Sequence, residues 1–229
     1  MFIVAEIGVN WNGDFELLEK MLFNAKSSGF DSVKFQAFNE TVIGDHPKKK
    51  ILLESSINKK NIEKIDSLAS KNNIDWFCTP MYVDAVDLLL PYVKRFKIRE
   101  IDGRSLLKNR ITPLTQKILN TKKDVFVSVN SPPNSSQYQK NEQIKWLYCV
   151  PKYPCKSEDI DFKNIKNFSG YSNHCDDSTV IIEIAKLGAE IIEIHVTQDK
   201  QGIYIDNPVS FDFTECSEII NKIKEVKNN

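Results

Sequence analysis

Eight short runs of β-branched and aromatic residues recur along the chain, and helix-periodic segments follow most of them. Such alternation is the pattern of strand–helix units around a parallel sheet. Eight units match a closed (β/α)8 barrel, although an open, doubly wound sheet would give a similar pattern. The expected strands span residues 2–10, 32–38, 75–80, 95–100, 124–130, 145–151, 168–174 and 190–197.

Polar side chains inside these strands favour the barrel. In the last strand, Glu193 and His195 share one face and Ile194 lies on the other, because successive side chains point to opposite sides. A parallel strand covered on both faces is hydrophobic throughout, and these strands are not. In a barrel, outward residues pack on helices, while inward residues near the carboxyl ends line one shared pocket. We therefore expect residues 1–229 to form a single TIM-barrel domain, a fold that needs about 250 residues.

Two helices carry clear boundary signals. The segment DFELLEKMLFNAKSSG has Asp14 as a candidate N-cap and Gly29 as a stop, and DDSTVIIEIAKLG ends in the same way at Gly188. The segment FTECSEIINKIKEVK is the expected last helix, and SPPNSS is an expected irregular connection.

Charge and cysteine content exclude several classes of protein. The 31 Lys and Arg residues balance the 31 Asp and Glu residues without a long run of like charge, so nucleic acid and membrane are not expected partners. The five cysteines have no regular spacing, which is typical of a reducing compartment. The apolar start lacks a basic segment and meets Glu6 early, and no apolar stretch reaches the roughly 18 residues of a membrane span. We expect a cytoplasmic protein.

Several segments resemble those of the sialic acid (N-acetylneuraminate) synthase family, in the same order. AEIGVNWNG, FDSVKFQAF, FCTP and FKI match the first four strands of that family, and YPCKSEDIDFKNI, GYSNH and LGAEIIEIHVTQD match its closing third. Members of the family condense phosphoenolpyruvate with an amino sugar to make nonulosonic acids. The resemblance extends over nearly the whole chain and implies a TIM barrel, phosphoenolpyruvate and a sugar aldehyde as partners, and this transferase activity.

The resemblance also implies a metal site. In the family, two histidines hold a divalent ion, usually Mn²⁺ or Mg²⁺, and they correspond to His174 and His195. Water and the sugar aldehyde fill the other positions, and such an open coordination sphere suits Lewis-acid polarisation of a carbonyl. Glu193 is then expected to bond a ligating imidazole or the incoming sugar. The alternative is that each histidine is an ordinary hydrogen-bonded interior residue.

A set of polar residues corresponds to the phosphoenolpyruvate site of the family. Lys34 and Lys97 resemble the lysines that bind its carboxylate and phosphate, and the alternative is that they form ion pairs with Glu6 or Glu100. Other polar positions around the same ligand, for which local backbone hydrogen bonds are the alternative, are Gln36, Thr79, Ser128, Tyr153 and Ser172.

Two carboxylates complete the expected site. Glu6 is the candidate acid–base group, because water attacks C2 of phosphoenolpyruvate while C3 attacks the aldehyde, and the protons need a nearby carrier. Asp206 corresponds to an aspartate near the last helix of the family, although a helix-capping role is an alternative.

The chain departs from the family pattern at four single positions, and its segment SVNSPPN lacks the STGM of the family. Trp11 and Asn207 stand where histidines are usual, and Pro151 replaces an asparagine or serine. Glu100 replaces a phosphate-binding serine, and a carboxylate there repels phosphate unless Arg99 or a lysine neutralises it. The chain also stops after the eighth helix, where typical members continue into an antifreeze-like domain.

The leading hypothesis is a metal-dependent condensation of phosphoenolpyruvate with an amino sugar or related aldose, in surface polysaccharide biosynthesis. Two alternatives stay open: a metal-dependent aldolase or isomerase that does not use phosphoenolpyruvate, and a non-catalytic barrel that binds a sugar or a partner protein. The acceptor sugar is not determined by the sequence, and a homodimer remains open as an assembly.

Overall fold

The computed structural model describes residues 1–228, and within them the parallel strands β1 to β8 pair in chain order. Because β1 also pairs with β8, the sheet closes on itself. This closure confirms the predicted (β/α)8 barrel and rejects the open doubly wound sheet. The barrel strands are β1 (Phe2–Gly8), β2 (Ser32–Ala37), β3 (Asp75–Pro80), β4 (Arg95–Ile98), β5 (Asp124–Val129), β6 (Ile144–Tyr148), β7 (Gly170–Ser172) and β8 (Ile191–Thr197).

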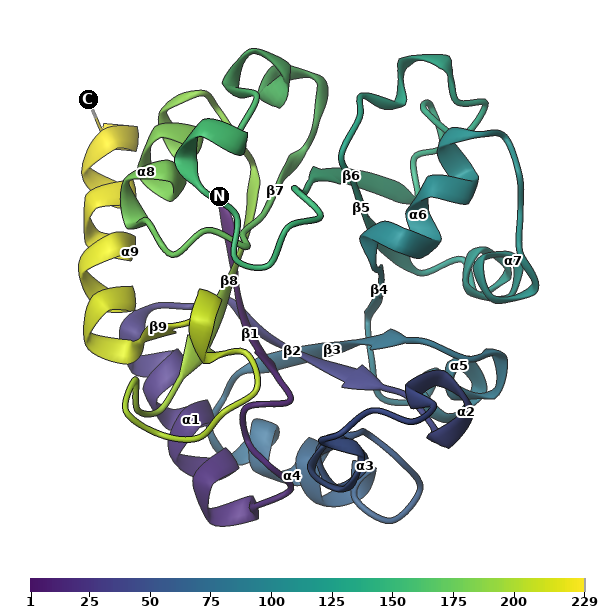
Figure 1. Ribbon diagram of the computed structural model, residues 1–229, viewed down its shortest axis with the longest axis vertical. Coiled ribbons are helices and arrows are strands. Elements are labelled where there is room, and N and C mark those ends of the chain that lie inside the picture. Colours follow the sequence, from purple (N-terminus) through teal and green to yellow (C-terminus); the bar gives the residue numbers. More distant parts are fainter. Residues whose placement is uncertain (229) are drawn as a thin grey trace.

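Helices surround the barrel on its outside (Figure 1). They are α1 (Phe15–Ser28), α2 (Glu40–Ile43), α3 (Lys49–Ser55), α4 (Ile62–Lys71), α5 (Val83–Leu89), α6 (Glu100–Leu107), α7 (Pro113–Asn120), α8 (Ser178–Lys186) and α9 (Phe213–Asn228). In Figure 1, α1, α8 and α9 cover one side of the barrel, and α5, α6 and α7 cover the other. None of the helices in residues 1–228 has both the length and the hydrophobicity that a membrane span requires.

The connections before and after β6 are not α-helical in the described chain. They contain only the short 3₁₀ turns η1 (Pro133–Ser135), η2 (Ser157–Asp159) and η3 (Phe162–Asn167). The predicted irregular segment SPPNSS lies at the first of these connections, and this prediction is confirmed. After β8, the chain passes through η4 (Asn207–Val209) and the two-residue strand β9 (Phe211–Asp212), which pairs with β8 and was not predicted.

The predicted boundaries of two helices are confirmed, and capping explains them. The Asp14 carboxylate accepts hydrogen bonds from the backbone N–H groups of Glu16 and Leu17, and so satisfies two of the free donors at the start of α1. Gly29 ends α1 in the left-handed conformation, with φ 95°. In α8, the helix stops at Lys186, and Gly188 follows with φ 94°.

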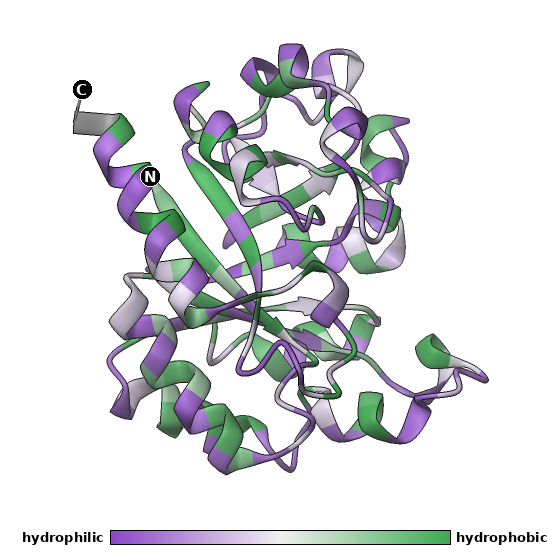
Figure 2. Cartoon of the chain, turned by 60° about the vertical axis from the view of Figure 1, so that its left-hand side comes forward, coloured by the Kyte–Doolittle hydropathy of each residue, from purple (hydrophilic) through white to green (hydrophobic). Residues whose placement is uncertain are grey.

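The hydrophobic core lies between the outward faces of the strands and the helices. In β5, Val125, Val127 and Val129 are buried on this face, as their alternation in the sequence predicts. Figure 2 shows hydrophobic residues concentrated in the central strands, while the helices carry alternating hydrophobic and hydrophilic bands. The outward faces therefore hold the fold together, and the inward faces are left to carry the polar residues.

The amino-terminal end of the barrel interior is filled by one arginine and three phenylalanines. The guanidinium of Arg95 bonds to Asp75, with NH1 2.5 Å from Oδ2, and lies 4.8 Å from the ring centroid of Phe2. The rings of Phe77 and Phe126 pack edge to face, with centroids 5.5 Å apart. Because this end is closed by packed side chains, an inward cavity has room only toward the carboxyl ends of the strands.

Candidate active site

A cavity of about 230 Å³ opens at the carboxyl ends of the barrel strands. Every residue that the sequence singled out for the site lines it, which supports the prediction that these side chains converge on one hollow, although their roles remain predictions. The lining consists of Glu6, Lys34, Gln36, Thr79, Met81, Lys97, Arg99, Glu100, Ser128, Cys149, Tyr153, Ser172, His174, Glu193, His195 and Asp206.

The register of the strands places these side chains on the inward faces of neighbouring strands. Glu6 of β1 pairs with Lys34 of β2 on one side and with His195 of β8 on the other. In the same way, Ser172 of β7 pairs with Glu193 of β8. Because paired residues on neighbouring parallel strands point to the same side of the sheet, all five face the barrel interior. Glu6 and His195 are neighbours in the sheet only because the barrel closes.

Glu193 is the anchor of a buried charge network. Its two carboxylate oxygens accept hydrogen bonds from Lys97 at 2.8 and 2.7 Å, and one of them also accepts from Ser172 at 2.7 Å. Lys34 lies 3.8 Å from the same carboxylate. The structure shows Glu193 bonded to Lys97 and Ser172 and not to an imidazole, and its expected contact with the incoming sugar stays a prediction.

Lys34 is held by a second carboxylate. Its Nζ lies 2.8 Å from Oε1 of Glu6 and 3.2 Å from the Thr79 hydroxyl. Gln36 donates to the same Glu6 oxygen at 2.8 Å. The ion pair with Glu6 that the sequence offered as the alternative for Lys34 thus exists, whereas Lys97 pairs with Glu193 and not with Glu100. These pairs give each buried lysine an acidic partner and fix its position at the cavity.

The pKa values of the network follow from burial and from the neighbouring charges. Burial lowers the pKa of Lys34, but Glu193 and Glu6 more than offset this effect and leave its pKa raised. Burial dominates at Lys97, whose pKa is lowered although Glu193 opposes the shift. Burial raises the pKa of Glu193, but Lys34 and Lys97 outweigh it and hold the pKa well below its usual value. The carboxylate is therefore ionised at neutral pH.

The two candidate metal ligands lie side by side. The ring centroids of His174 and His195 are 5.5 Å apart, and the Tyr153 ring packs edge-on against both. His174 follows β7 and Tyr153 follows β6, so both stand on loops, whereas the sequence placed His174 within its strand. The separation of the rings suits one ion shared between them.

The histidine environment fits a divalent ion. Nδ1 of His174 lies 3.0 Å from the Val150 carbonyl oxygen, which can only accept, so Nδ1 carries the proton and Nε2 keeps its lone pair. Burial and then the charge of His195 lower the pKa of His174 to about 4, so the ring is neutral at neutral pH. Within residues 1–228, no group of three or more His, Cys, Asp or Glu side chains is arranged to hold a metal. The two-histidine metal site therefore stays a prediction.

Asp206 faces the cavity instead of capping a helix. It precedes η4 but makes no side-chain capping bond there, and its Oδ2 lies 3.6 Å from Nδ1 of His195. Burial raises the pKa of Asp206, but the hydrogen bond and the charge of His195 lower it. The two lowering effects outweigh burial, so the pKa of Asp206 lies below its usual value. Asn10 fixes this loop, because its side chain accepts from the Asp206 backbone N–H at 3.0 Å and donates to the Val196 carbonyl at 2.9 Å. The capping alternative for Asp206 is wrong.

Two cavity atoms lack a partner. Among the described residues, Oε2 of Glu6 and Oγ of Ser128 are buried without a hydrogen bond. A buried polar atom without a partner costs about 1–3 kcal/mol, so such atoms at a cavity are candidates for ligand contact. They lie on β1 and β5, on opposite sides of the barrel.

Three of the four departures from the family pattern lie away from the cavity. Trp11 is buried, and its indole donates to the Ser55 carbonyl at 2.9 Å, while Asn207 donates to the Gly202 carbonyl at 2.6 Å. Pro151 is not among the lining residues. Glu100 does line the cavity, and the residue that neutralises it is Arg104, not Arg99 as expected from the sequence. Of these four residues, Glu100 is therefore the one that places a charge in the cavity.

Sequence reasoning missed the lining residues Met81 and Cys149, and it named the lining residue Arg99 only as a possible partner of Glu100. Strand alternation carried a signal for two of them, because Arg99 follows the parity of Lys97, and Cys149 follows the inward parity of Leu147 in β6. The thiol of Cys149 lies 3.7 Å from Nδ1 of His174, and burial raises its pKa to about 12. Cys149 was not predicted as a lining residue because it stands among hydrophobic residues in the sequence.

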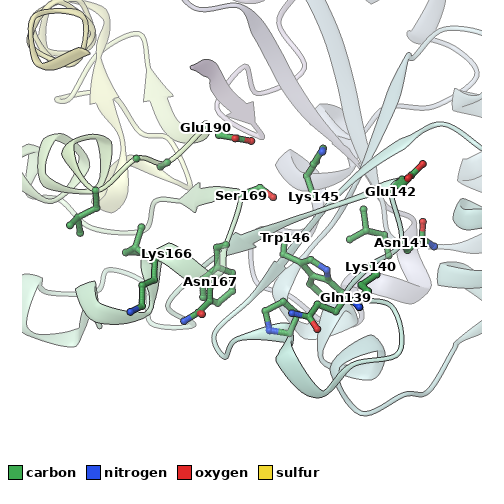
Figure 3. A pocket seen from close by; sticks show the side chains of 17 residues that line it. Gln139, Lys140, Asn141, Glu142, Lys145, Trp146, Lys166, Asn167, Ser169 and Glu190 are labelled. Carbon is green, nitrogen blue, oxygen red and sulfur yellow. The ribbon is translucent and has the colours of Figure 1, made fainter. Parts of the chain in front are cut away.

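A larger cavity of about 600 Å³ lies outside the barrel, where β6, η3 and the end of α8 meet. Figure 3 shows Lys166 and Asn167 on one side of it and Trp146 with Gln139 on the other. It contains no predicted site residue, and its charged groups stand on exposed loops and strand starts. The carboxyl-end cavity is therefore the candidate active site.

A closed parallel barrel with ionisable side chains gathered at the carboxyl ends of its strands defines an enzyme of the TIM-barrel class. The chain belongs to the NeuB family, whose model matches residues 21–229.

Relatives with assigned names are synthases of nonulosonic acids. The N,N'-diacetyllegionaminic acid synthase of Legionella pneumophila is 27% identical over 256 residues, which cover 99% of this chain and 72% of that protein. The N-acetylneuraminate-9-phosphate synthase of Mus musculus is 24% identical, and the matched region covers 99% of this chain and 70% of that protein. The crystal structure of N-acetylneuraminic acid synthetase from Leptospira borgpetersenii matches 99% of this chain and 84% of its own, with a TM-score of 0.86 and 24% identity, and thus shares the fold.

Proposed function

We propose that this protein condenses phosphoenolpyruvate with an amino sugar or a related aldose, giving a 2-keto-3-deoxy acid of the nonulosonic type and phosphate. The observation that carries the proposal is that two buried lysines and two histidines face one cavity in a NeuB-family barrel. The names of the relatives from Legionella pneumophila and Mus musculus support the same product class. The product would serve surface polysaccharide biosynthesis.

Lys34 and Lys97 are the proposed ligands of the phosphoenolpyruvate carboxylate and phosphate. Both are buried and charged, and an incoming anion would share them with Glu6 and Glu193. The proposed hydrogen-bonding contacts of the same ligand are Gln36, Thr79, Ser128 and Ser172.

The bond changes require two proton movements. C3 of phosphoenolpyruvate bonds to the aldehyde carbon, whose oxygen takes up one proton. Water adds to C2 and gives up both of its protons as the bond from C2 to the phosphate oxygen breaks and the C2 carbonyl forms, one proton going to the aldehyde oxygen and the other to the departing phosphate. Glu6 is our candidate for carrying these protons, because its Oε2 is buried without a partner in the described chain. Its Oε1 is meanwhile held by Lys34 and Gln36, which fixes the free oxygen toward the cavity.

His174 and His195 would hold a divalent ion, Mn²⁺ or Mg²⁺, which when bound supplies Lewis-acid polarisation of the sugar carbonyl. Val150 fixes the tautomer of His174, and Asp206 faces Nδ1 of His195. Tyr153 packs against both rings and keeps their orientation.

The test is phosphate release from phosphoenolpyruvate with Mn²⁺ and a panel of amino sugars. Lys97→Met should lower kcat/KM by about 100-fold or more, because a buried cation at the anion site is lost. Lys94→Met removes an exposed lysine three residues away and should leave kcat/KM unchanged. If folded and metal-replete protein releases no phosphate with any sugar of the panel, the proposal is rejected.

A metal-dependent aldolase or isomerase is the second candidate. The carboxylate of Glu100 at the cavity favours it, since a negative charge there opposes a phosphate group. Turnover of a sugar in the absence of phosphoenolpyruvate would establish this second function.

A further inference from the structure

Glu100 brings a carboxylate to the cavity from the start of α6. It is only 8% exposed and lines the cavity together with Lys97 and Ser128. Arg104, one helical turn later, holds it through both oxygens, with Nε 2.7 Å from Oε1 and NH2 2.7 Å from Oε2. This geometry is a bidentate ion pair, the strongest form that arginine makes with a carboxylate.

Helix stability alone does not account for this pair. An acidic residue in the first turn and an i,i+4 ion pair both stabilise a helix when fully exposed. Here the Glu100 side chain is 9% exposed, while the Arg104 side chain is 47% exposed. The pair therefore runs from the cavity to the solvent, and Arg104 compensates a charge that is held inside the site.

The helix turn that carries Glu100 packs closely against β5. Gly103, on the next turn of α6, lies so close to β5 that a Cβ there would collide with the carbonyl oxygen of Ser128 and touch the Val127 and Val129 methyl groups. This contact seats the first turn of α6 against the strand that carries Ser128. The backbone of this turn therefore has no room to move closer to β5.

The cations at this end of the cavity are already paired. Lys97 contacts both oxygens of Glu193, and Nε of Arg99 lies 2.5 Å from Asp102. Arg104 is occupied by Glu100. A phosphate group would bring up to two further negative charges beside Glu100, whereas an unphosphorylated keto acid brings only its carboxylate.

We infer that Glu100 and Arg104 are specificity-determining residues that set how strongly the cavity distinguishes the enol phosphate phosphoenolpyruvate from the unphosphorylated keto acid pyruvate. The Glu100 charge opposes the phosphate group, and the Arg104 charge offsets this opposition. The inference deepens the proposed function and rests on it for the identity of the substrate. It assigns the two residues opposite effects on the same ligand.

The experiment measures the Kd values of phosphoenolpyruvate and of pyruvate, each with Mn²⁺, for the full chain. Glu100→Gln should tighten phosphoenolpyruvate binding by about tenfold, and Arg104→Gln should weaken it by about tenfold, because each changes the local charge by one unit. The double variant Glu100→Gln with Arg104→Gln should return close to the wild-type value. Pyruvate affinity should change by less than about twofold to threefold in all three variants, because pyruvate lacks the phosphate.

Asp84→Asn is the matched control. It removes an acidic residue from the first turn of α5, which also follows a barrel strand, but it is exposed and outside the cavity lining. It should leave both Kd values unchanged, and the Tm of every variant reports whether it is folded.

Two results overturn the inference. One is that the affinities for both acids fall together with the Tm in each variant, which a merely structural pair would give. The other is that phosphoenolpyruvate binding does not differ between Glu100→Gln and Arg104→Gln, including the case in which none of the proteins binds it. Absence of phosphate release with charge-dependent binding intact would instead reject the proposed function and leave this selectivity standing.

Discussion

Glu193 lies between Lys34 and Lys97, and with Glu6 these two lysines and two glutamates form three buried ion pairs. None of them is a lone buried charge, which would cost several kcal/mol. The carboxylates oppose the effect of burial on both lysines, and at Lys34 they outweigh it and raise its pKa. This arrangement explains how polar residues persist within otherwise hydrophobic strands.

Replacing Glu193 tests this network. Glu193→Gln should lower the free energy of unfolding by about 3–5 kcal/mol at neutral pH, because Lys97 and Lys34 lose a buried partner. The folded-state pKa of Glu193 is lowered, so its contribution is present above the unfolded pKa and is lost as the pH falls toward the folded value. The gap between wild type and variant should therefore narrow progressively below about pH 4.3.

Urea denaturation at several pH values measures this gap. Glu190→Gln is the control, because Glu190 is an exposed glutamate three residues earlier, and it should change stability by less than about 0.5 kcal/mol. A gap that stays constant from pH 7 to pH 3 would show that the charge of Glu193 is not what stabilises the fold.

At the scale of elements, the end of β1 is irregular at the point where it meets the site. Its pairing with β2 passes from Glu6–Lys34 directly to Gly8–Phe35, so Ile7 is skipped. Gly8 has φ 52°, in the left-handed region that favours glycine. A bulge of this kind re-aims a strand next to an active site, and here it leaves the Glu6 carboxylate free to face the cavity.

The bulge gives a prediction with a matched control. A Cβ on Gly8 would lie 3.1 Å from Oε1 of Glu6 and 3.2 Å from Oδ2 of Asp206, whereas a Cβ on Gly188, with φ 94°, would meet nothing within 4 Å. Both Gly8→Ala and Gly188→Ala should lower stability by about 1–2 kcal/mol, through backbone strain. Gly8→Ala alone should also weaken Mn²⁺ and phosphoenolpyruvate binding, because it displaces two cavity carboxylates.

Thermal unfolding and ligand titration of both variants test this difference. Unchanged binding in Gly8→Ala, at a stability loss equal to that of Gly188→Ala, would mean that the cavity tolerates the added methyl group. The sequence could not reveal this bulge, because Gly8 looks like an ordinary member of an alternating strand.

At the scale of the whole molecule, barrel closure creates the site. Pairing of β1 with β8 joins the first and last strands and sets Glu6 beside His195, although 189 positions separate them in the chain. Below the cavity, Arg95 and the phenylalanine rings close the interior. A ligand of the cavity therefore binds the folded barrel and not the unfolded chain.

Metal binding should consequently stabilise the whole fold. Mn²⁺ at 100 times its Kd should stabilise the wild type by about 2.7 kcal/mol, and a chelator should reverse the rise in Tm. His195→Asn should lose this response, because one proposed ligand is gone. His46→Asn changes the third histidine, which is exposed and far along the chain from both, and should keep it.

Calorimetric scans with Mn²⁺, with chelator and with Mg²⁺ provide the measurement. The prediction fails if the wild type and His195→Asn show equal shifts in Tm, which would indicate binding elsewhere.

The sequence by itself predicted the barrel and most of the residues that line the cavity. Strand alternation put Lys34, Lys97 and Glu193 on inward faces, because side-chain direction within a strand is a local property of the backbone. Cap and stop residues such as Asp14 and Gly29 fixed helix α1 for the same local reason.

Only the tertiary structure decided the partners of these side chains. Whether Lys97 pairs with Glu193 or Glu100, and whether Arg99 or Arg104 neutralises Glu100, depends on distances across the barrel and along a helix placed by packing. These distances are set by closure, register and the seating of α6 on β5, which involve residues far apart in the chain. Local sequence therefore specifies which groups enter the cavity, and long-range packing specifies which of them meet.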